Sequence, residues 1–285
     1  MTTYGVAGAS GQLGRLVLGE LLDRVDAGSV VAFGRDVAKL ADYAARGVDV
    51  RAMDYDQPDT LAAQLAGVDR LLLISGSALG ERPRQHGAVI DAAKAAGVSY
   101  MLYTSILKAD TTPIKLGAEH KATEDMLAAS GITHDVARLG WYSENYMGSL
   151  PVQVEMGVIT GAQGAGRVSS ASRADYAAGL AALLVEGTGG KTYDLAGDDS
   201  WTMADFAEEL GRQTGKDIQY VDMGEAEYAA SLEAVGLPPY VAAVVANSAH
   251  ATSLGALEND SRTLSGLTGR ATTPIAISIA KALGQ

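Results

Sequence analysis

The sequence predicts an α/β fold: a doubly wound parallel sheet with a smaller C-terminal α/β lobe. The first observation is that strand-like and helix-like apolar patterns alternate from Thr3 to Arg138. The second is that glycine follows several predicted helices, where it best tolerates the left-handed turn that ends a helix. The third is that Leu71–Ile74 is apolar throughout, as expected of a strand buried on both faces of a parallel sheet.

The elements of the first half follow from this alternation. Strands are predicted at Thr3–Ala7, Val30–Phe33, Val48–Met53, Leu71–Ser75, Tyr100–Ser105 and Thr133–Arg138. The first predicted helix carries Leu13, Leu16, Val17, Leu21 and Leu22 on one face. Further helices are predicted at Val37–Arg46, Thr60–Ala66, Arg84–Ala96 and Ala118–Ser130, ended by Gly47, Gly67, Gly97 and Gly131.

In the second half of the sequence the regular alternation of strand and helix patterns ends. The glycine-rich stretch Gly157–Gly166 predicts a loop. After it we expect a helix near Asp175–Val185, a strand at Thr192–Leu195 and a helix at Met203–Gln213, with Thr202 as its N-cap. The remainder predicts short helical pieces.

Composition limits the classes of function. The 285 residues carry a formal net charge of −12, which argues against nucleic-acid binding because that usually needs a basic face. There is no cysteine, so disulfides and cysteine metal sites are excluded, and the scattered histidines show no metal-ligand spacing. Since no signal segment or long apolar run is present, we expect a cytoplasmic protein without membrane contact.

A glycine cluster follows the first predicted strand and opens the first predicted helix. Its residues are Gly8, Ala9, Ser10, Gly11, Gln12, Leu13 and Gly14, with the spacing GxxGxxG. Glycines let the backbone turn tightly, and the free N–H groups of the first helical turn point at an anion. A strand, turn and helix of this kind are typical of a Rossmann-type site for a dinucleotide pyrophosphate.

Arg35 indicates which dinucleotide binds. After the second strand, an acidic residue would bond the ribose hydroxyls of NAD, but Gly34 and Arg35 occupy this place. A guanidinium suits a 2′-phosphate, so we favour NADP(H) as the cofactor. Asp36 would repel a phosphate unless it caps the helix that begins at Val37, and the alternative for Arg35 is an ordinary exposed loop arginine.

Ser75, Gly76 and Ser77 end the fourth predicted strand at the same edge of the sheet. Small residues there let a cofactor pass closely, although a plain turn would have the same composition. We therefore predict a dinucleotide-binding domain over residues 1–150 and a smaller substrate lobe over residues 151–285, partly interleaved with it.

The chain resembles the NmrA-like branch of atypical short-chain dehydrogenases/reductases, and within it the bacterial NAD(P)H:quinone oxidoreductases of type 2. The resemblance is carried by Gly8–Gly14, Arg35, Leu71–Ser77, Tyr103–Ser105, Gly140–Asn145, Ser172–Tyr176 and Tyr193–Gly197. It implies reduction of quinones with NADPH and without flavin. Others in the branch bind NADP without turnover and act as redox-sensing regulators.

The Tyr-x-x-x-Lys pair of ordinary short-chain dehydrogenases is missing. At the matching place the chain has no tyrosine, and His120 stands near the position of the lysine. His120, Glu124 and Leu127 share one predicted helical face, so His120 is a candidate hydrogen-bond or proton donor to a quinone oxygen, or a contact of the cofactor ribose. The alternative is a partly buried histidine bonded to a backbone carbonyl.

The resemblance implies further site residues. Those on the nicotinamide side are Leu139, Gly140, Trp141, Tyr142, Ser143 and Glu144, with Arg173 approaching the cofactor from the second half. Tyr142 and Asn145 are then candidates for the quinone pocket, one stacking and one bonding a carbonyl oxygen. The alternatives are a hydrophobic plug formed by Trp141, Tyr142 and Tyr146, and a helix-capping role for the segment around Arg173.

The predicted function is NADPH-dependent two-electron reduction of a small-molecule quinone. A redox sensor with little catalysis, and reduction of an activated double bond or imine on the same scaffold, stay open as alternatives. The sequence leaves the oligomeric state open, with a homodimer as the candidate assembly.

Overall fold

The computed structural model describes residues 1–285 and contains a seven-stranded sheet. Its strands, in the spatial order β3-β2-β1-β4-β5-β6-β8, are β3 Asp49–Ala52, β2 Val30–Gly34, β1 Tyr4–Ala7, β4 Arg70–Leu73, β5 Tyr100–Ile106, β6 Thr133–Leu139 and β8 Thr192–Leu195. From β3 through β6 every neighbouring pair is parallel. The predicted doubly wound parallel sheet is confirmed, and its strand order reverses direction between β1 and β4.

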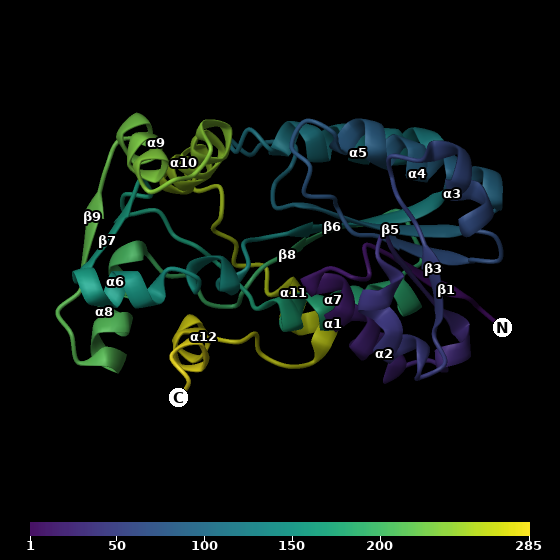
Figure 1. Ribbon diagram of the computed structural model, residues 1–285, viewed down its shortest axis with the longest axis horizontal. Coiled ribbons are helices and arrows are strands. Elements are labelled where there is room, and N and C mark those ends of the chain that lie inside the picture. The colour runs from purple at the N-terminus through teal and green to yellow at the C-terminus, as the bar shows by residue number, and fades with distance from the viewer. The chain divides into compact units, whose positions relative to one another are not determined.

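Helices cover both faces of this sheet. They are α1 Gln12–Leu22, α2 Ala41–Ala44, α3 Pro58–Gln64, α4 Arg82–Ala96, α5 Gly117–Ser130 and α7 Arg173–Glu186, with short 3-10 turns at Ala27–Ser29 and Val37–Leu40. Figure 1 shows α3, α4 and α5 above the strands and α1 and α7 below them. The left-handed glycines Gly47, Gly67, Gly97 and Gly131 lie where they were predicted to end segments.

The helix predicted at Val37–Arg46 is wrong in its extent. A 3-10 turn, Val37–Leu40, is followed by the single α-helical turn of α2. Only Leu40 and Tyr43 are buried in these two turns, so little packing supports a longer regular helix.

The core beside α3, α4 and α5 holds the carboxyl ends of the central strands in place. Leu71, Leu72 and Leu73 are completely buried, which confirms the expectation of a strand covered on both faces. Phe33, near the end of β2, and Tyr103, in the middle of β5, belong to the same apolar cluster as Leu71 and Leu73. Loops that follow these strands therefore start from fixed positions.

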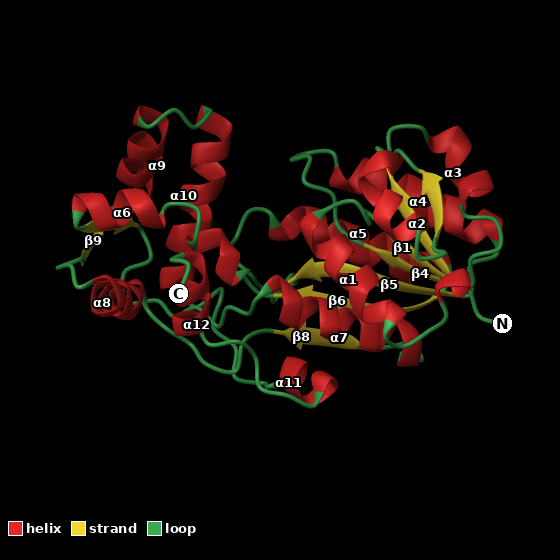
Figure 2. Ribbon diagram, turned by 60° about the horizontal axis from the view of Figure 1, so that its bottom comes forward, coloured by secondary structure: helices red, strands yellow, loops and turns green.

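The chain divides into two compact units. Unit 1 comprises Met1–Ala109, Ala118–Leu139 and Arg173–Tyr193, and unit 2 comprises Asp110–Gly117, Gly140–Ser172 and Asp194–Gln285. The elements of unit 2 include α6 Leu150–Met156, β7 Val158–Gly161, α8 Met203–Thr214, β9 Gln219–Asp222, α9 Glu225–Ala234, α10 Pro239–Ser253, α11 Thr263–Thr268 and α12 Ile275–Ala282 (Figure 2).

The loop predicted at Gly157–Gly166 contains a strand instead. Gly157 ends α6 with a φ of +67°, and β7 then pairs in parallel with β9. A side chain at Gly161 would lie 2.1 Å from the Gln163 side chain, so this glycine serves close packing within the strand region. The strand β9 was not predicted because most of its residues are exposed, which removes the apolar alternation that marks a strand.

The predicted N-cap of α8 is confirmed. Thr202 accepts a hydrogen bond from the Asp205 amide at 3.1 Å, and the Asp205 carboxylate accepts one from the Thr202 amide at 2.8 Å. Together these bonds form a capping box. None of the helices is both long and apolar enough to cross a lipid bilayer.

Candidate functional site

The carboxyl edge of the sheet in unit 1 gathers most of the predicted cofactor residues. Because the strands are parallel, β1, β2, β4 and β5 all end at this edge, and the glycine cluster directly follows β1. In sheets of this kind ligands bind outside the carboxyl ends, at the point where the strand order reverses.

The glycine cluster contains two positions, Gly8 and Gly14, that do not accommodate a side chain. Gly8 has a φ of +83°, a backbone conformation that side chains disfavour. The Gly11 amide donates to the Gly8 carbonyl at 3.1 Å, which closes the turn. A Cβ atom on Gly14 would lie 2.4 Å from the Gly8 carbonyl oxygen and 2.7 Å from the Ala9 Cα. Helix α1 therefore packs directly on the backbone of the turn.

The N-terminus of α1 is suited to bind an anion. Its N-cap, Gly11, has an extended backbone and supplies no side-chain cap, and no acidic residue occupies the first turn. The amide groups of Gln12 and Leu13 begin this turn, so the positive end of the helix dipole is not neutralised by a carboxylate. A glycine-rich turn beside an uncapped helix N-terminus fits a dinucleotide pyrophosphate.

The glycine turn is joined to the end of β2. The Ala9 amide donates to the Phe33 carbonyl at 2.9 Å. A Cβ atom on Gly34 would lie 3.0 Å from Ser10 Oγ, so Gly34 and Ser10 pack closely. Arg35 follows Gly34 directly and is exposed. It thus lies next to the glycine turn, at the position where Rossmann-type sites bind a ribose 2′-phosphate.

Asp36 caps the turn that follows it, which was one of the two roles considered for this residue. Its carboxylate accepts a hydrogen bond from the Ala38 amide at 3.1 Å and caps the 3-10 turn. The charge of Arg35 affects a different carboxylate, because it helps to lower the pKa of Asp56. Hydrogen bonds from Arg84 and Gln85, followed by the charges of Arg84 and Arg35, hold the pKa of Asp56 below its ordinary value.

The turn after β4 is held by side chains from three directions. The Ser75 amide donates to Thr104 Oγ1 of β5 at 2.8 Å, and the Gly76 amide donates to His86 Nε2 of α4 at 3.1 Å. The Gly80 amide donates to Glu119 of α5 at 3.0 Å. Ser75–Ser77 is thus anchored and not a free turn. His86 was not among the predicted site residues, because its contact with Gly76 joins a loop and a helix and no sequence spacing indicates it.

His120 bonds the hydroxyl of a buried tyrosine. Its Nδ1 lies 2.8 Å from the Tyr103 hydroxyl oxygen, and both residues are buried. The tautomer of His120 sets the direction of this bond: Tyr103 donates to Nδ1 when the His120 proton is on Nε2, and accepts from Nδ1–H when it is on Nδ1. The partner is thus a side-chain hydroxyl, whereas the structural alternative had expected a backbone carbonyl.

His120 is uncharged at neutral pH. Burial, together with the charge of Arg82, lowers its pKa to about 3. Burial likewise raises the pKa of Tyr103 far above its ordinary value, so its hydroxyl keeps its hydrogen. His120 can therefore offer a neutral N–H donor at Nε2, in the tautomer in which Tyr103 donates to Nδ1, but not an imidazolium proton.

Glu124 and Leu127 share the buried face of α5 with His120, as the helical spacing predicted. The Glu124 carboxylate accepts two hydrogen bonds from Arg138, at 3.0 and 2.7 Å, and one from Ser105 Oγ at 2.5 Å. Since its oxygens are bonded within the protein, Glu124 supports the end of β5.

The segment expected on the nicotinamide side spans the boundary between the units. Leu139 is the last residue of β6 in unit 1, and Gly140–Asn145 belongs to unit 2. The Gly140 amide donates to the Leu195 carbonyl at 2.8 Å. Arg173, the first residue of α7, lies in unit 1.

Within unit 2 the segment is well anchored. The Ser143 amide donates to the Ala171 carbonyl at 2.9 Å, and its hydroxyl lies 3.0 Å from that of Ser170. Tyr142 is half-buried and Asn145 is exposed.

Tyr146, which was weighed as part of a hydrophobic plug, packs inside unit 2. Its ring lies edge-on to Trp201, with centroids 4.8 Å apart, and also contacts Phe206. Trp201 in turn donates from Nε1 to Ser170 Oγ at 3.1 Å. This aromatic cluster supports the segment that precedes it along the chain.

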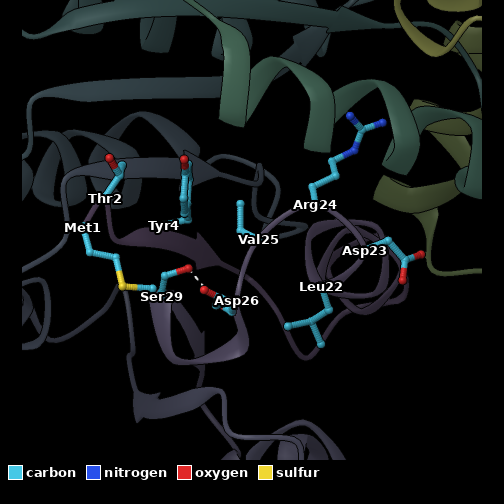
Figure 3. A pocket seen from close by; sticks show the side chains of 9 residues that line it. All are labelled: Met1, Thr2, Tyr4, Leu22, Asp23, Arg24, Val25, Asp26 and Ser29. Atoms are coloured by element: carbon cyan, nitrogen blue, oxygen red, sulfur yellow. Dashed lines mark hydrogen bonds between the residues drawn. The ribbon is translucent and has the colours of Figure 1, made fainter.

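A pocket of about 520 Å³ lies at the other edge of the sheet, where β1 begins (Figure 3). It is lined by Met1, Thr2, Tyr4, Leu22, Asp23, Arg24, Val25, Asp26 and Ser29. Ser29 Oγ donates to the Asp26 carbonyl at 2.6 Å across its floor. Because parallel sheets bind ligands at their carboxyl edge, this pocket is separate from the candidate site.

Comparisons with known proteins show what the chain is similar to. A family described as NAD(P)H-binding matches residues 8–186. Quinone oxidoreductase 2 of Escherichia coli is 49% identical over 275 residues, which are 96% of each chain.

Two solved structures extend the likeness to the fold. The crystal structure of an NADPH-dependent quinone oxidoreductase from E. coli, complexed with NADPH, has a TM-score of 0.97 at 47% identity and covers 99% of this chain and 100% of that one. Triphenylmethane reductase from Citrobacter sp., complexed with NADP(H), has a TM-score of 0.94 at 34% identity, covering 98% and 100%.

Proposed function

Because the chain belongs to the NmrA-like family of NAD(P)H-binding proteins, we propose that it reduces quinones by two electrons with NADPH and without a flavin. The observation that carries this proposal is the 49% identity to a quinone oxidoreductase over nearly the whole of both chains. The glycine turn and the uncapped start of α1 supply the matching physical site.

Different residues of unit 1 would bind different parts of NADPH. Gly8–Gly14 and the first amides of α1 would hold the pyrophosphate, and Arg35 would bond the 2′-phosphate. Ser75, Gly76 and Ser77 would line the path of the cofactor beside them. When bound, NADPH supplies a hydride at its nicotinamide ring. Leu139–Glu144 and Arg173 are the proposed contacts on the nicotinamide side.

The protein needs to supply little acid catalysis to a quinone. Reduction of a quinone gives a phenolate-like anion whose conjugate acid has a pKa of about 10, far below that of an alcohol. A neutral hydrogen-bond donor can stabilise such an anion, whereas a ketone needs a positioned acid. His120 is the proposed donor, through Nε2–H, in the tautomer in which Tyr103 donates to Nδ1. Tyr142 and Asn145 are the proposed contacts of the quinone ring and its carbonyl oxygen.

The test is oxidation of NADPH by a small benzoquinone or naphthoquinone with purified, flavin-free protein. The uncatalysed rate is subtracted and NADH is run in parallel. We expect saturable turnover that prefers NADPH. Tight binding of NADPH without turnover across several quinones would contradict the enzyme proposal and favour a redox sensor. Turnover of an azo, imine or activated double bond but of no quinone would correct the substrate class alone.

A further inference from the structure

We propose that His86 is a positioning residue that preorders the turn Ser75–Ser77 for NADPH. The proposal rests on the proposed function for the identity of the ligand. Its physical basis is a hydrogen-bond chain that runs from the turn through His86 into α5, together with the close packing of the His86 ring.

The hydrogen-bond partners assign the tautomer of His86. The Gly76 amide donates to Nε2 at 3.1 Å, and since a backbone amide can only donate, Nε2 carries no hydrogen. The proton is therefore on Nδ1, which donates to Thr123 Oγ1 at 3.0 Å. The Thr123 hydroxyl in turn donates a hydrogen bond to the Glu119 carbonyl at 3.1 Å. Each of these three hydrogen bonds has one donor and one acceptor in this arrangement.

Packing holds the ring in the orientation that this chain requires. His86 is completely buried, and its ring lies edge-on to Tyr103, with centroids 5.4 Å apart, and to Tyr55, at 6.4 Å. A flip of the ring would leave the Gly76 amide without an acceptor in a partly buried site. Burial and the nearby charge of Arg82 also lower the pKa of His86 to about 4, so the acceptor persists at neutral pH.

The consequence for the turn is that its amides are bonded before any ligand arrives. Ser75 bonds Thr104 and Gly76 bonds His86, so both amides point into the protein. The turn follows β4, the strand that neighbours β1 at the reversal of strand order. A segment that is already ordered loses less conformational freedom on binding, which strengthens affinity. His86 thus contributes to NADPH affinity without needing to contact NADPH.

Two substitutions separate the two bonds of His86. In His86→Gln the side-chain oxygen can reach the place of Nε2 and accept from Gly76. In His86→Asn the amide nitrogen can reach the place of Nδ1 and donate to Thr123, but Gly76 loses its acceptor. Both variants remove the aromatic ring, so a general packing loss would affect them alike.

The first measurement is amide hydrogen exchange of Gly76 in the cofactor-free protein, and the second is the Kd of NADPH by fluorescence titration. For His86→Asn we expect about ten-fold faster exchange at Gly76 and about ten-fold weaker NADPH binding than for His86→Gln. The KM for NADPH should rise in the same ratio, with kcat at saturating NADPH similar in the two variants. A long-range proton–nitrogen spectrum should place the wild-type His86 proton on Nδ1.

Equal exchange rates and equal Kd values in the two variants would overturn the proposal, as would a proton on Nε2. Failure of the proposed function would look different: wild-type protein would bind NADPH but reduce no quinone, or would not bind NADPH. In either case the exchange at Gly76 and the tautomer still decide the role of His86.

Discussion

Acidification should destabilise unit 1 through its two buried histidines, His86 and His120. Both are uncharged in the folded protein, with pKa values lowered to about 4 and about 3, mainly by burial. In the unfolded chain each returns to an ordinary value of about 6.5. The unfolded state therefore binds more protons below this value. Stability is full above about pH 6.5 and falls as the pH drops toward the folded-state pKa values.

The magnitude follows from these values. At about pH 5 the protonated form of an exposed histidine outnumbers the neutral form about thirty-fold, whereas both buried rings stay largely neutral. With 1.36 kcal/mol for each pKa unit, each ring lowers the free energy of unfolding by about 2 kcal/mol relative to about pH 8. The expected loss for the two together is about 4 kcal/mol. Carboxylates with lowered pKa values, such as Asp56 and Glu209, contribute in a more acidic range, below about pH 4.

The assay is urea unfolding at a series of pH values between about 5 and 8, followed by circular dichroism. The wild type is compared with the double variant His86→Gln and His120→Gln, which lacks both titrating rings. The variant will be less stable at every pH, so the quantity compared is the change of its unfolding free energy with pH. An equal loss in the double variant and the wild type would refute the reasoning, because other groups would then cause it.

Five further substitutions, one of them a control, test the candidate site. Arg35→Ala should weaken NADPH binding by about ten- to a hundred-fold and NADH binding far less, because a charge-assisted bond to the 2′-phosphate is lost; an equal loss for both would contradict the assignment. Gly14→Ala forces a Cβ atom to within 2.4 Å of the Gly8 carbonyl oxygen and should cost about 1–3 kcal/mol of stability along with NADPH affinity, as measured by unfolding and titration. Gly28→Ala is its control, since nothing lies within 4 Å of that Cβ position, and equal effects would remove the steric argument. His120→Ala should lower the rate of quinone reduction without abolishing NADPH binding, and Tyr103→Phe, which frees the His120 tautomer, should reproduce part of this loss; unchanged kinetics in both would make the pair structural.

The predictions from sequence succeeded where a local pattern has one physical outcome. The apolar run Leu71–Ile74 and the β-α alternation required a parallel sheet buried by helices, and the structure contains it. The N-cap Thr202 and the cap by Asp36 were also local, because three or four consecutive residues contain both bonding partners. The strands β7 and β9 were missed because their pairing joins residues far apart in the chain and leaves β9 largely exposed.

The sequence by itself determined the fold class, the glycine turn and the place of Arg35 after β2, because each depends on residues that are neighbours in the chain. Only the tertiary structure decided the roles of the histidines. His86 and Gly76 are ten residues apart, and Tyr103 and His120 are seventeen apart on different elements. No periodicity predicts such contacts. Hydrogen-bond directions and burial, which fix the tautomer of His86 and lower the pKa values, exist only once β4, β5, α4 and α5 have packed together.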